Sequence, residues 1–538
     1  MSAGHLKEQT ETRMKQKQLT LRSIIFGSLG SIIITTSSIY IALRMGSLPW
    51  PTIFVAILSM TLLKGFGQTN QNEINVTHTA MSAGAMVAGG LAFTIPGIWI
   101  IDRKMDIGYG IVAFIAIFGT VLGLIFTFIM RKHFIEHKKY QYPIGTAAAE
   151  TVKAGYNKEK GKYLFSMLGL SAIFTAARDG LKIIPSTWEA TSLASKNIFL
   201  GARISPMAIG IGYIIGPKHT SVWFLGALIS YLGIIPIGLS QEWFVNLDVA
   251  ESFKNSLGIG LMVGAGIAII FKDILPQAKH IYRSIFTQKG AEKWLPLIFA
   301  FMALLLTVLT GMGFMLSVLT ITGVWLTTSM SATITGQTGI NPMNSFAIIV
   351  LLAIKAFIDL GGSTAIFVAA IVAVACGLTG DVLNDYKAGY ILKTDPKSQF
   401  VSEAIGGIIG AVVATAVLFI MLSAFKEIGP GTELPAPQAF ATSSLISGIP
   451  HMKAFLTGLF IGIILYMLNF PAMMLGLGIY LPVFISSTAF IGGLIHIIVK
   501  KVFKMDQEDK GVIVASGLLG GEGVTGVAVA ITRVISGT

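Results

Sequence analysis

The chain has 538 residues, of which 53% are hydrophobic and only 12% are charged, and its mean hydropathy is +0.75. A soluble chain of this length would carry about 25% charged residues, so the composition excludes a soluble multidomain protein and indicates a polytopic membrane protein. The net charge of +13 does not indicate nucleic-acid binding, because the basic residues cluster in a few loops, and the single cysteine, Cys376, excludes an intramolecular disulfide.

Apolar runs recur along the whole chain, as in proteins that cross a membrane many times. The runs at 205–217 and 472–484 are too short to cross about 30 Å of hydrocarbon, so we expect half-helices there. The fold class is therefore an all-α polytopic membrane protein with roughly 14–16 transmembrane helices and some broken or re-entrant ones. The expected spans are 21–43, 49–65, 75–98, 108–130, 163–184, 205–217, 219–238, 256–271, 294–309, 311–333, 341–358, 362–378, 398–424, 451–468, 472–484, 485–501 and 511–533.

The basic loops predict the orientation. They cover Lys7–Arg22, Arg131–Lys162 and Lys272–Lys293, and cytoplasmic loops carry such an excess because Lys and Arg resist translocation. We therefore expect a multi-pass protein of the inner (plasma) membrane with a cytoplasmic N-terminus. The expected organisation is a cytoplasmic tail at 1–20, a first transmembrane repeat at 21–272, a cytoplasmic linker at 273–293 and a second repeat at 294–538.

Short sequence echoes favour the two repeats. The segment "MAIGIGY" at 207–213 resembles "MMLGLGIY" at 473–480, and "FLGAL" at 224–228 resembles "FIGGL" at 490–494, with the same offset of 266 residues. Internal duplication is common in secondary transporters, where the substrate site lies at the repeat interface. The loop charges leave open whether the repeats are parallel or inverted.

The segment "GQTNQNEINVTHTA" at 67–80 places Glu73, Asn75 and His78 at the start of an apolar run. An ionisable group inside hydrocarbon costs roughly 2.5–3.5 kcal/mol, so such groups normally face a water-filled pathway or a partner. The alternative is that the polar residues of this segment belong to a solvated loop. We expect all three residues to line the substrate site, with Glu73 and His78 exchanging protons.

The segment "TITGQTGINPMN" at 333–344 predicts a broken helix, because two glycines and a proline lie between apolar spans. Its Asn341 stands at the 266-residue offset from Asn75. Unwound backbone at membrane depth is tolerated where it lines a cavity. Gln337, Asn341 and Asn344 are therefore candidate substrate contacts, although a structural break without a ligand remains the alternative.

Two similar blocks predict a charged lip at the cytoplasmic mouth. "YPIGTAAAETVKAGY" (142–156) contains Glu150 and Lys153, and "LTGDVLNDYKAGY" (378–390) contains Asp385 and Lys387. We interpret these four residues as a cytoplasmic gate. The alternative is a pair of helix ends with local ion pairs and snorkelling lysines.

Glu522 stands alone among glycines in a late apolar span, "ASGLLGGEGVTG". A lone carboxylate there is costly unless it is protonated or paired. We therefore add Glu522 to Glu73 and His78 as a candidate for proton coupling. No nucleotide-binding or hydrolase motif accompanies it (GxxxxGK[ST], HExxH and GxSxG are all missing), so we expect no enzyme activity, no cofactor and no resident metal.

Several blocks together resemble the oligopeptide transporter family in its short prokaryotic form, from about residue 20 to the end. They include "NEINVTHTAMSAGAMVAGG", "KKYQYPIGTAAAETVKAG", "GDVLNDYKAGYILKTDPKSQFVSEAIGGIIGA" and "ASGLLGGEGVTGVAVAI". The block "DYKAGYILKTDPKSQF" is the most specific and is also similar to plant yellow-stripe-like metal-chelate carriers. The chain departs from the family's Asn-Pro-Gly signature, because its nearest text is Asn341-Pro342-Met343.

The resemblance implies a proton-coupled secondary transporter that imports small peptides by alternating access. The alternative is a proton-coupled importer of metal chelates of the siderophore or nicotianamine kind. The expected partners are the lipid bilayer, the substrate and protons, with a homodimer as one open assembly and no nucleic acid. On this interpretation Glu73→Gln should abolish uphill uptake. A membrane-embedded enzyme or a passive channel remain the other classes to test.

Overall fold

The computed structural model describes residues 18–46, 48, 52–154, 158–190, 200–269, 271–272, 295–338, 341–425, 427–447, 449–502 and 508–536. Most of the expected tail at 1–20 and the expected linker at 273–293 lie outside these residues. Ten helices of the described part are long and apolar enough to cross a membrane, and five more apolar helices have 10–17 residues. The chain is a multi-pass, all-α membrane protein, as its composition predicts.

The first half of the chain begins with long helices and ends in a run of shorter ones around a small hairpin. Its elements are α2 (Leu21–Met45), α3 (Thr52–Gly65), α4 (Gln71–Ala92), α5 (Gly97–Ile101), α6 (Tyr109–Arg131), η1 (Lys132–His137), α7 (Pro143–Ala154), α8 (Lys158–Thr175), η2 (Ala176–Gly180), β1 (Thr187–Glu189), β2 (Gly201–Arg203), α10 (Pro206–Ile215), α11 (Pro217–Leu228), η3 (Ile229–Ile234), α12 (Ile235–Ser240) and α13 (Leu247–Ile269), with η marking π-helical turns.

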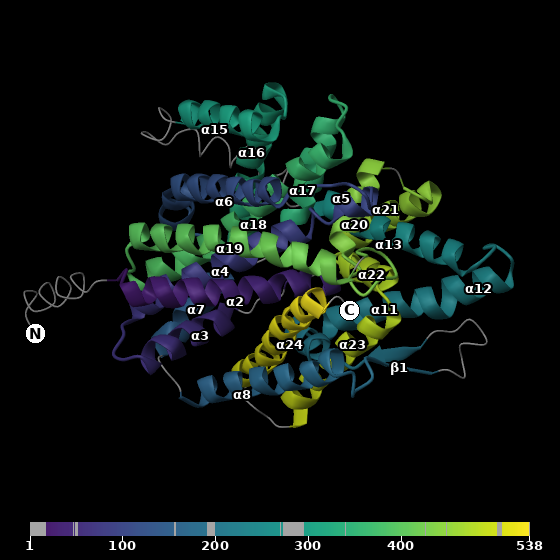
Figure 1. Ribbon diagram of the computed structural model, residues 1–538, viewed down its shortest axis with the longest axis horizontal. Helices are drawn as coiled ribbons and strands as arrows, with labels where there is room; N and C mark the ends of the chain where they lie inside the picture. Colours follow the sequence, from purple (N-terminus) through teal and green to yellow (C-terminus); the bar gives the residue numbers. More distant parts are fainter. Residues whose placement is uncertain are drawn as a thin grey trace, which may run out of the picture.

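The elements of the second half are all helices in its described residues. Its elements are α15 (Leu295–Thr310), α16 (Phe314–Thr338), α17 (Met343–Lys355), α18 (Gly362–Leu392), α19 (Pro396–Phe425), α20 (Pro437–Ser447), α21 (Met452–Met467), α22 (Ala472–Tyr480), α23 (Val483–Val502) and α24 (Glu508–Ser536). Most of the long helices of both halves lie side by side with their axes along one common line, in either chain direction (Figure 1).

Helix α18 is the centre of one bundle. Of its 31 residues 24 are buried, which agrees with the long apolar run in its first two thirds. It packs against α4, α6, α16 and α17, while α4 packs in turn against α2 and α19. We call these helices, together with α7 and α20, the central bundle.

A second bundle is formed by α8, α10, α11, α13 and α21–α24, and glycines let its helices touch. A Cβ added at Gly212 of α10 would meet the carbonyl oxygen of Ala489, and one at Gly478 of α22 would meet that of Trp223. The two contacts are related by the offset of 266 residues seen in the sequence: Gly478 is Gly212 shifted forward by 266, and Trp223 is Ala489 shifted back by 266. We call this the glycine bundle, and its close backbone contacts are typical of helix packing in membranes.

The same exchange recurs at Gly226, which would meet the carbonyl oxygen of Leu475, and at Gly492, which would meet that of Ile209. Paired contacts of this kind are what two repeats folding around each other would produce. The helices that exchange roles are α10 with α22 and α11 with α23. The internal repeat stays a prediction, and these contacts favour it.

Three helices are short or interrupted within the bundles. Helix α10 has 10 residues and α22 has nine, at the two places where the sequence predicts half-helices. Helix α16 ends at Thr338 and α17 begins at Met343, after Asn341 and Pro342 in non-helical backbone. The predicted break at 333–344 is therefore present, and Pro342 explains why the helix cannot continue through it.

The strands β1 and β2 form a small antiparallel hairpin in which Trp188 lies opposite Ala202. The hairpin lies at the edge of the glycine bundle (Figure 1). Arg203, the last residue of β2, directly precedes the turn into α10. The hairpin therefore fixes the backbone just before the half-helix.

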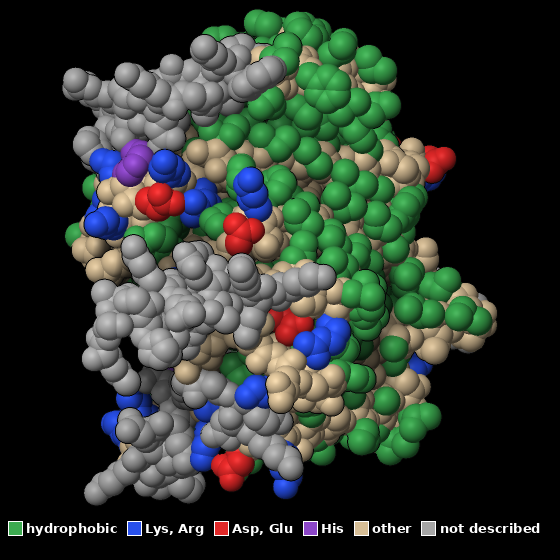
Figure 2. Space-filling view, turned by 90° about the vertical axis from the view of Figure 1, so that its left-hand side faces the viewer, with side chains coloured by type: hydrophobic (Ala, Val, Ile, Leu, Met, Phe, Trp, Pro, Cys, Tyr) green, Lys and Arg blue, Asp and Glu red, His purple; other side chains and the backbone are tan. Residues whose placement is uncertain are grey.

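The outer surface of the bundles is apolar, as lipid contact requires. Figure 2 shows a broad hydrophobic flank, with Lys and Arg side chains gathered on another part of the surface beside residues that are not described. Large exposed hydrophobic side chains include Ile173, Phe301 and Phe460 on helices and Phe357 in the turn after α17. The single cysteine, Cys376, is buried within α18, and its Sγ donates a hydrogen bond to Thr327 Oγ1 at 3.2 Å.

Candidate functional site

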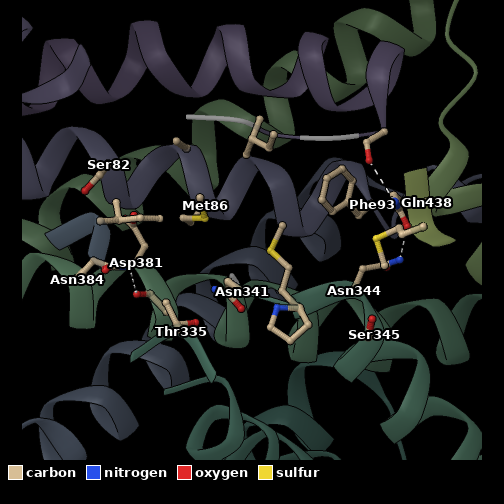
Figure 3. A pocket seen from close by; sticks show the side chains of 18 of the residues that line it. Ser82, Met86, Phe93, Thr335, Asn341, Asn344, Ser345, Asp381, Asn384 and Gln438 are labelled. Atoms are coloured by element: carbon tan, nitrogen blue, oxygen red, sulfur yellow. Dashed lines mark hydrogen bonds between the residues drawn. The ribbon is translucent and has the colours of Figure 1, made fainter. Parts of the chain in front are cut away.

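The central bundle encloses a cavity of about 450 Å³, which we call the central cavity (Figure 3). Its walls come from α4, from the break between α16 and α17, from α18 and from α20. Polar side chains gather at its two ends, and Met86 and Asn341 lie between them. The lining residues used below are Ser82, Met86, Thr335, Asn341, Met343, Asn344, Asp381, Asn384, Gln438 and Met473.

One end of the central cavity holds a carboxylate on α18. Asp381 lines the cavity beside Ser82, Thr335 and Asn384 (Figure 3). Its Oδ2 is buried and accepts no hydrogen bond from the described residues. Asn384 is held in place, since its Oδ1 accepts from Gly145 N at 3.0 Å and its Nδ2 donates to Gly380 O at 2.9 Å. Asp381 is therefore the charge that the cavity offers to a ligand.

A second carboxylate lies one helical turn beyond Asp381. Ser82 Oγ donates to Asp385 Oδ2 at 2.6 Å, and His78 Nδ1 lies 3.4 Å from Asp385 Oδ1. His78 and Asp385 are each only 1% exposed. Residues four apart share one face of a helix, so Asp381 and Asp385 are neighbours. Asp381 and Asp385 thus form a short row of carboxyl groups that leads from the cavity wall to His78, and we call it the acidic row.

Glu403 of α19 extends this acidic region. It is fully buried, and neither of its carboxyl oxygens has a hydrogen-bond partner among the described residues. Gln399, one turn earlier on α19, donates from Nε2 to Asp385 O at 2.8 Å and so ties the two helices together. Three carboxyl groups on α18 and α19 thus lie within apolar helices, a placement that normally marks a functional site.

The other end of the central cavity is formed by amides. Asn344 Nδ2 donates to Gln438 Oε1, and Gln438 Nε2 donates to Gly46 O at 3.1 Å (Figure 3). Asn341 is fixed by the broken helix, because its Nδ2 donates to Cys376 O at 3.0 Å and to Gly377 O at 2.9 Å. Asn341 and Asn344 therefore line the cavity, where the sequence places a substrate site.

Glu73 and Asn75 lie at the start of α4, outside the cavity lining. Glu73 Oε2 is 3.0 Å from Arg22 Nη2, and the same carboxylate accepts from Thr20 Oγ1 at 2.6 Å and from Thr69 Oγ1 at 2.7 Å. Asn75 Nδ2 donates to Thr394 Oγ1 at 3.3 Å. These contacts fasten the first turn of α4 to α2 and to the end of α18. Of the three residues predicted from this segment, His78 is the one beside the acidic row.

Glu522 of α24 is buried and has several partners. It accepts from Arg178 Nη2 at 2.8 Å, from Ser205 Oγ at 2.9 Å and from the backbone N of Met207 at 2.8 Å. Met207 N belongs to the first turn of α10, so the carboxylate caps the N-terminus of a half-helix. Arg178 is also paired with Asp179 at 2.6 Å. Glu522 therefore closes the start of α10 and does not line the central cavity.

The four residues predicted as a cytoplasmic gate lie on α7 and α18, which pack against each other, and their side chains have different partners. Glu150 and Lys153 form an exposed pair on α7, with 3.1 Å between Oε1 and Nζ. Lys387 Nζ donates to Tyr140 O at 2.8 Å. Asp385 is buried beside His78, so it belongs to the acidic row. The side chain of Gln337 lies outside the described part of the chain.

Sequence reasoning missed Asp381, Ser82, Asn384 and Gln438. The signal for Asp381 is present in "LTGDVLNDYKAGY", since it precedes Asp385 by one helical turn in an apolar helix. Gln438 lies in a loop-to-helix segment whose spacing carries no such signal. Among the described residues, no group of three or more His, Cys, Asp or Glu side chains could hold a metal ion.

Comparisons with known proteins agree with this architecture. The family described as "OPT oligopeptide transporter protein" matches residues 18–533. A Haemophilus influenzae protein with the provisional name of oligopeptide transporter is 24% identical over 91% of this chain and 92% of its own length. The metal-nicotianamine transporter YSL2 of Arabidopsis thaliana is 22% identical over 79% of this chain and 76% of its own. The chain belongs to the OPT oligopeptide transporter family, whose members are membrane transporters and not enzymes.

Proposed function

We propose that this chain imports small peptides together with protons, by alternating access across the inner membrane, with its N-terminus in the cytoplasm. The observation that carries the proposal is the central cavity with Asp381 in its wall. Its volume of about 450 Å³ lies within the range of roughly 300–1,000 Å³ that is usual for small-molecule sites. The cavity is large enough for a short peptide and too small for a folded polypeptide.

The lining chemistry suits a peptide. A peptide presents amide donors and acceptors, an ammonium group and variable side chains. Asn341, Asn344 and Asn384 offer amides, and Asp381 offers a carboxylate to an ammonium group. Met86, which lies between the two polar ends in Figure 3, adds an adaptable apolar surface that accepts side chains of different shape.

The acidic row supplies a route for proton coupling. Two carboxylates one helical turn apart repel each other when both are charged, so a proton or a substrate ammonium near Asp381 and Asp385 relieves the repulsion. His78 faces Asp385 from α4 and is the group best suited to receive or deliver that proton. Substrate and proton then act on the same pair of carboxyl groups, which links their binding.

Two bundles suit an alternating-access movement. Both bundles pack closely through backbone contacts at glycines, and the central bundle also holds the cavity at its broken helix. Rocking of one rigid body against another around a central site is the usual movement of transporters built from repeats. We therefore place the moving boundary along the walls of the central cavity.

Import of metal chelates is the second candidate. It is favoured by the similarity to plant proteins named metal-nicotianamine transporters, of which one from Oryza sativa subsp. japonica is 27% identical over 37% of this chain and 33% of its own length. The described residues contain no ready cluster of metal ligands. On this candidate the metal therefore enters with its chelator around it.

Proteoliposomes loaded with a pH-sensitive dye test the proposal. Di- to hexapeptides are added outside, with and without ferric or nickel chelates, and acidification of the lumen is recorded. Asp381→Asn should abolish acidification driven by peptide, at least about a hundredfold, because the cavity loses its charged group. Asp106→Asn, which alters an exposed aspartate in a loop, is the matched control and should behave as the wild type.

Each outcome decides between the candidates. Acidification with bare peptide that disappears in Asp381→Asn supports proton–peptide symport. Acidification only with chelates would show that the substrate is a metal chelate and not a bare peptide. A folded Asp381→Asn protein with wild-type coupling would refute the role of Asp381, and no response to any compound would refute both substrate classes.

A further inference from the structure

A second cavity of about 340 Å³ lies beside the glycine bundle, and we call it the peripheral cavity. Its walls come from the hairpin, the first turns of α13, the loop before α20 and the junction of α22 with α23. The lining residues that bear on its chemistry are Arg203, Glu251, Lys254, Glu433, Pro435 and Tyr480. The cavity combines aromatic rings, prolines and charges of both signs.

Two of the four charged residues around the peripheral cavity already have partners within the protein. Lys254 is 2% exposed, and its Nζ donates to Tyr480 O at 3.0 Å and to Asn255 Oδ1 at 2.9 Å. Its ammonium group therefore closes the C-terminal end of α22, as cations do at helix ends. Glu433 lies 3.4 Å from Arg44, a buried arginine of α2. Lys254 and Glu433 therefore belong to the walls.

Arg203 and Glu251 differ from these wall residues. Within the described part of the chain, neither side chain makes a hydrogen bond or an ion pair, and Arg203 Nε is shielded from solvent without a partner. An unpaired guanidinium in such a place is costly unless something else pairs with it. The peripheral cavity therefore holds one cation and one anion that the fold leaves available.

We propose that the peripheral cavity is a binding site for the two charged ends of a zwitterionic peptide, with Arg203 holding its carboxylate and Glu251 its ammonium group. Guanidinium binds carboxylate in a two-pronged geometry, which makes arginine the suited partner for a free C-terminus. The proposal rests on peptide transport as the proposed function, and it adds a loading site ahead of the central cavity.

One short segment of chain, which we call the partition, lines both cavities and marks the place where a ligand would pass from one to the other. Pro435 lines the peripheral cavity and Gln438 lines the central one, three residues later. Between them Ala436 has φ = 42°, a left-handed backbone conformation that a residue with a Cβ rarely adopts. Hydrogen bonds hold it there, from Ala436 N to Leu43 O and from Tyr480 Oη to Pro435 O, each of 2.8 Å.

Only Ala436 and Pro437 lie between Pro435 and Gln438, and a few hydrogen bonds hold this segment, so the partition can act as a door between the cavities. Release of the bonds to Leu43 and Tyr480 would let the backbone at Ala436 relax and would join the cavities. The bond from Gln438 to Gly46 lies on the inner side of the same segment. The door thus connects the loading site to the amide end of the central cavity, where Asn344 also binds Gln438.

The test matches each protein charge with one ligand charge, in uptake assays with trialanine, N-acetyl-trialanine and trialanine amide. Arg203→Gln should raise KM for trialanine at least about tenfold and leave KM for the amide nearly unchanged, because the amide has no carboxylate for Arg203 to hold. Glu251→Gln should do the same for trialanine against its N-acetyl form. The maximal rate should change little in both variants.

Controls separate this site from the proposed function. Arg103→Gln and Glu427→Gln alter an exposed pair outside both cavities and should leave every KM unchanged. Wild-type uptake of trialanine with equal KM changes for all three peptides in Arg203→Gln would overturn the loading site while peptide transport stands. Failure of the wild type to take up any of the three would count against the proposed function itself. For a chelate whose amine and carboxylate groups already bind the metal, the KM for uptake should be the same in the wild type, in Arg203→Gln and in Glu251→Gln.

Discussion

Two groups of buried charges differ in their partners. In the glycine bundle Glu522 has an arginine, a hydroxyl and a backbone amide as partners, and Lys254 has two backbone carbonyls. In the central bundle Asp381 Oδ2 and both carboxyl oxygens of Glu403 have no hydrogen-bond partner among the described residues. All four groups lie in apolar helices, and only the first two are satisfied by the fold.

This difference separates charged groups that stabilise the fold from ionisable groups that are available to bind a ligand or a proton. A satisfied buried pair holds two elements in one arrangement, and its loss leaves a partner unpaired. A carboxyl group without a partner is costly to the folded state and is retained where a ligand or a proton can bind it. We therefore propose a structural role for Glu522 and a role in the proposed transport site for Asp381.

The largest effect is expected from the scaffold charge. Glu522→Gln should lower the free energy of unfolding by about 3–5 kcal/mol, because Arg178 is left with too few acceptors in a buried place. Thermal unfolding of the purified protein, followed by its loss of monodispersity, measures the effect. Glu427→Gln breaks an exposed pair of similar length and should cost less than about 1 kcal/mol. Equal losses in both variants would contradict the comparison.

A smaller effect is expected from the backbone contacts of the glycine bundle. Gly478→Ala should destabilise the protein by about 1–3 kcal/mol, because the new Cβ meets the carbonyl oxygen of Trp223 and separates α22 from α11. Gly169→Ala in α8 is the control, since nothing lies within 4 Å of its Cβ position. The control should be neutral or slightly stabilising. A neutral Gly478→Ala would show that these helices are not held at contact distance.

The smallest effect is expected at Glu73. Its ion pair with Arg22 is partly exposed on the arginine side, so Glu73→Gln should cost about 1 kcal/mol of stability and leave proton-coupled uptake intact. The sequence alone predicts the reverse, namely loss of uphill uptake. Uptake of peptide against a gradient, compared between Glu73→Gln and Asp381→Asn, decides between the two. Loss of proton coupling in Glu73→Gln would support the prediction from the sequence that the proton site lies at the start of α4.

Much of the fold follows from apolar periodicity and from glycine and proline. The half-helices at α10 and α22 and the break before α17 all lie where short apolar runs or Gly and Pro predict them. These features are local, so a single sequence reveals them. The number of full crossings is less accessible, because ten helices satisfy length and hydropathy while five apolar ones are shorter.

The sequence reveals some residues of the candidate site but not their partners, because the contacts of the site join residues that are far apart in the chain. Ser82 and Asp385 are 303 residues apart, and Glu522 and Arg178 are 344 apart. His78, Asp385 and Glu522 each stand out as polar residues in apolar runs, yet nothing local shows which of them have partners. The partners decide the roles, and they come from the packing of distant helices.

The single cysteine has a practical consequence for this chain. Cys376 is buried in α18 and engaged with Thr327, away from both lipid and water. The natural protein is therefore already a low-background host for thiol labelling. Cysteines introduced one at a time along the partition between the cavities would report, by their reaction with a water-soluble maleimide, when each face of the door becomes wet.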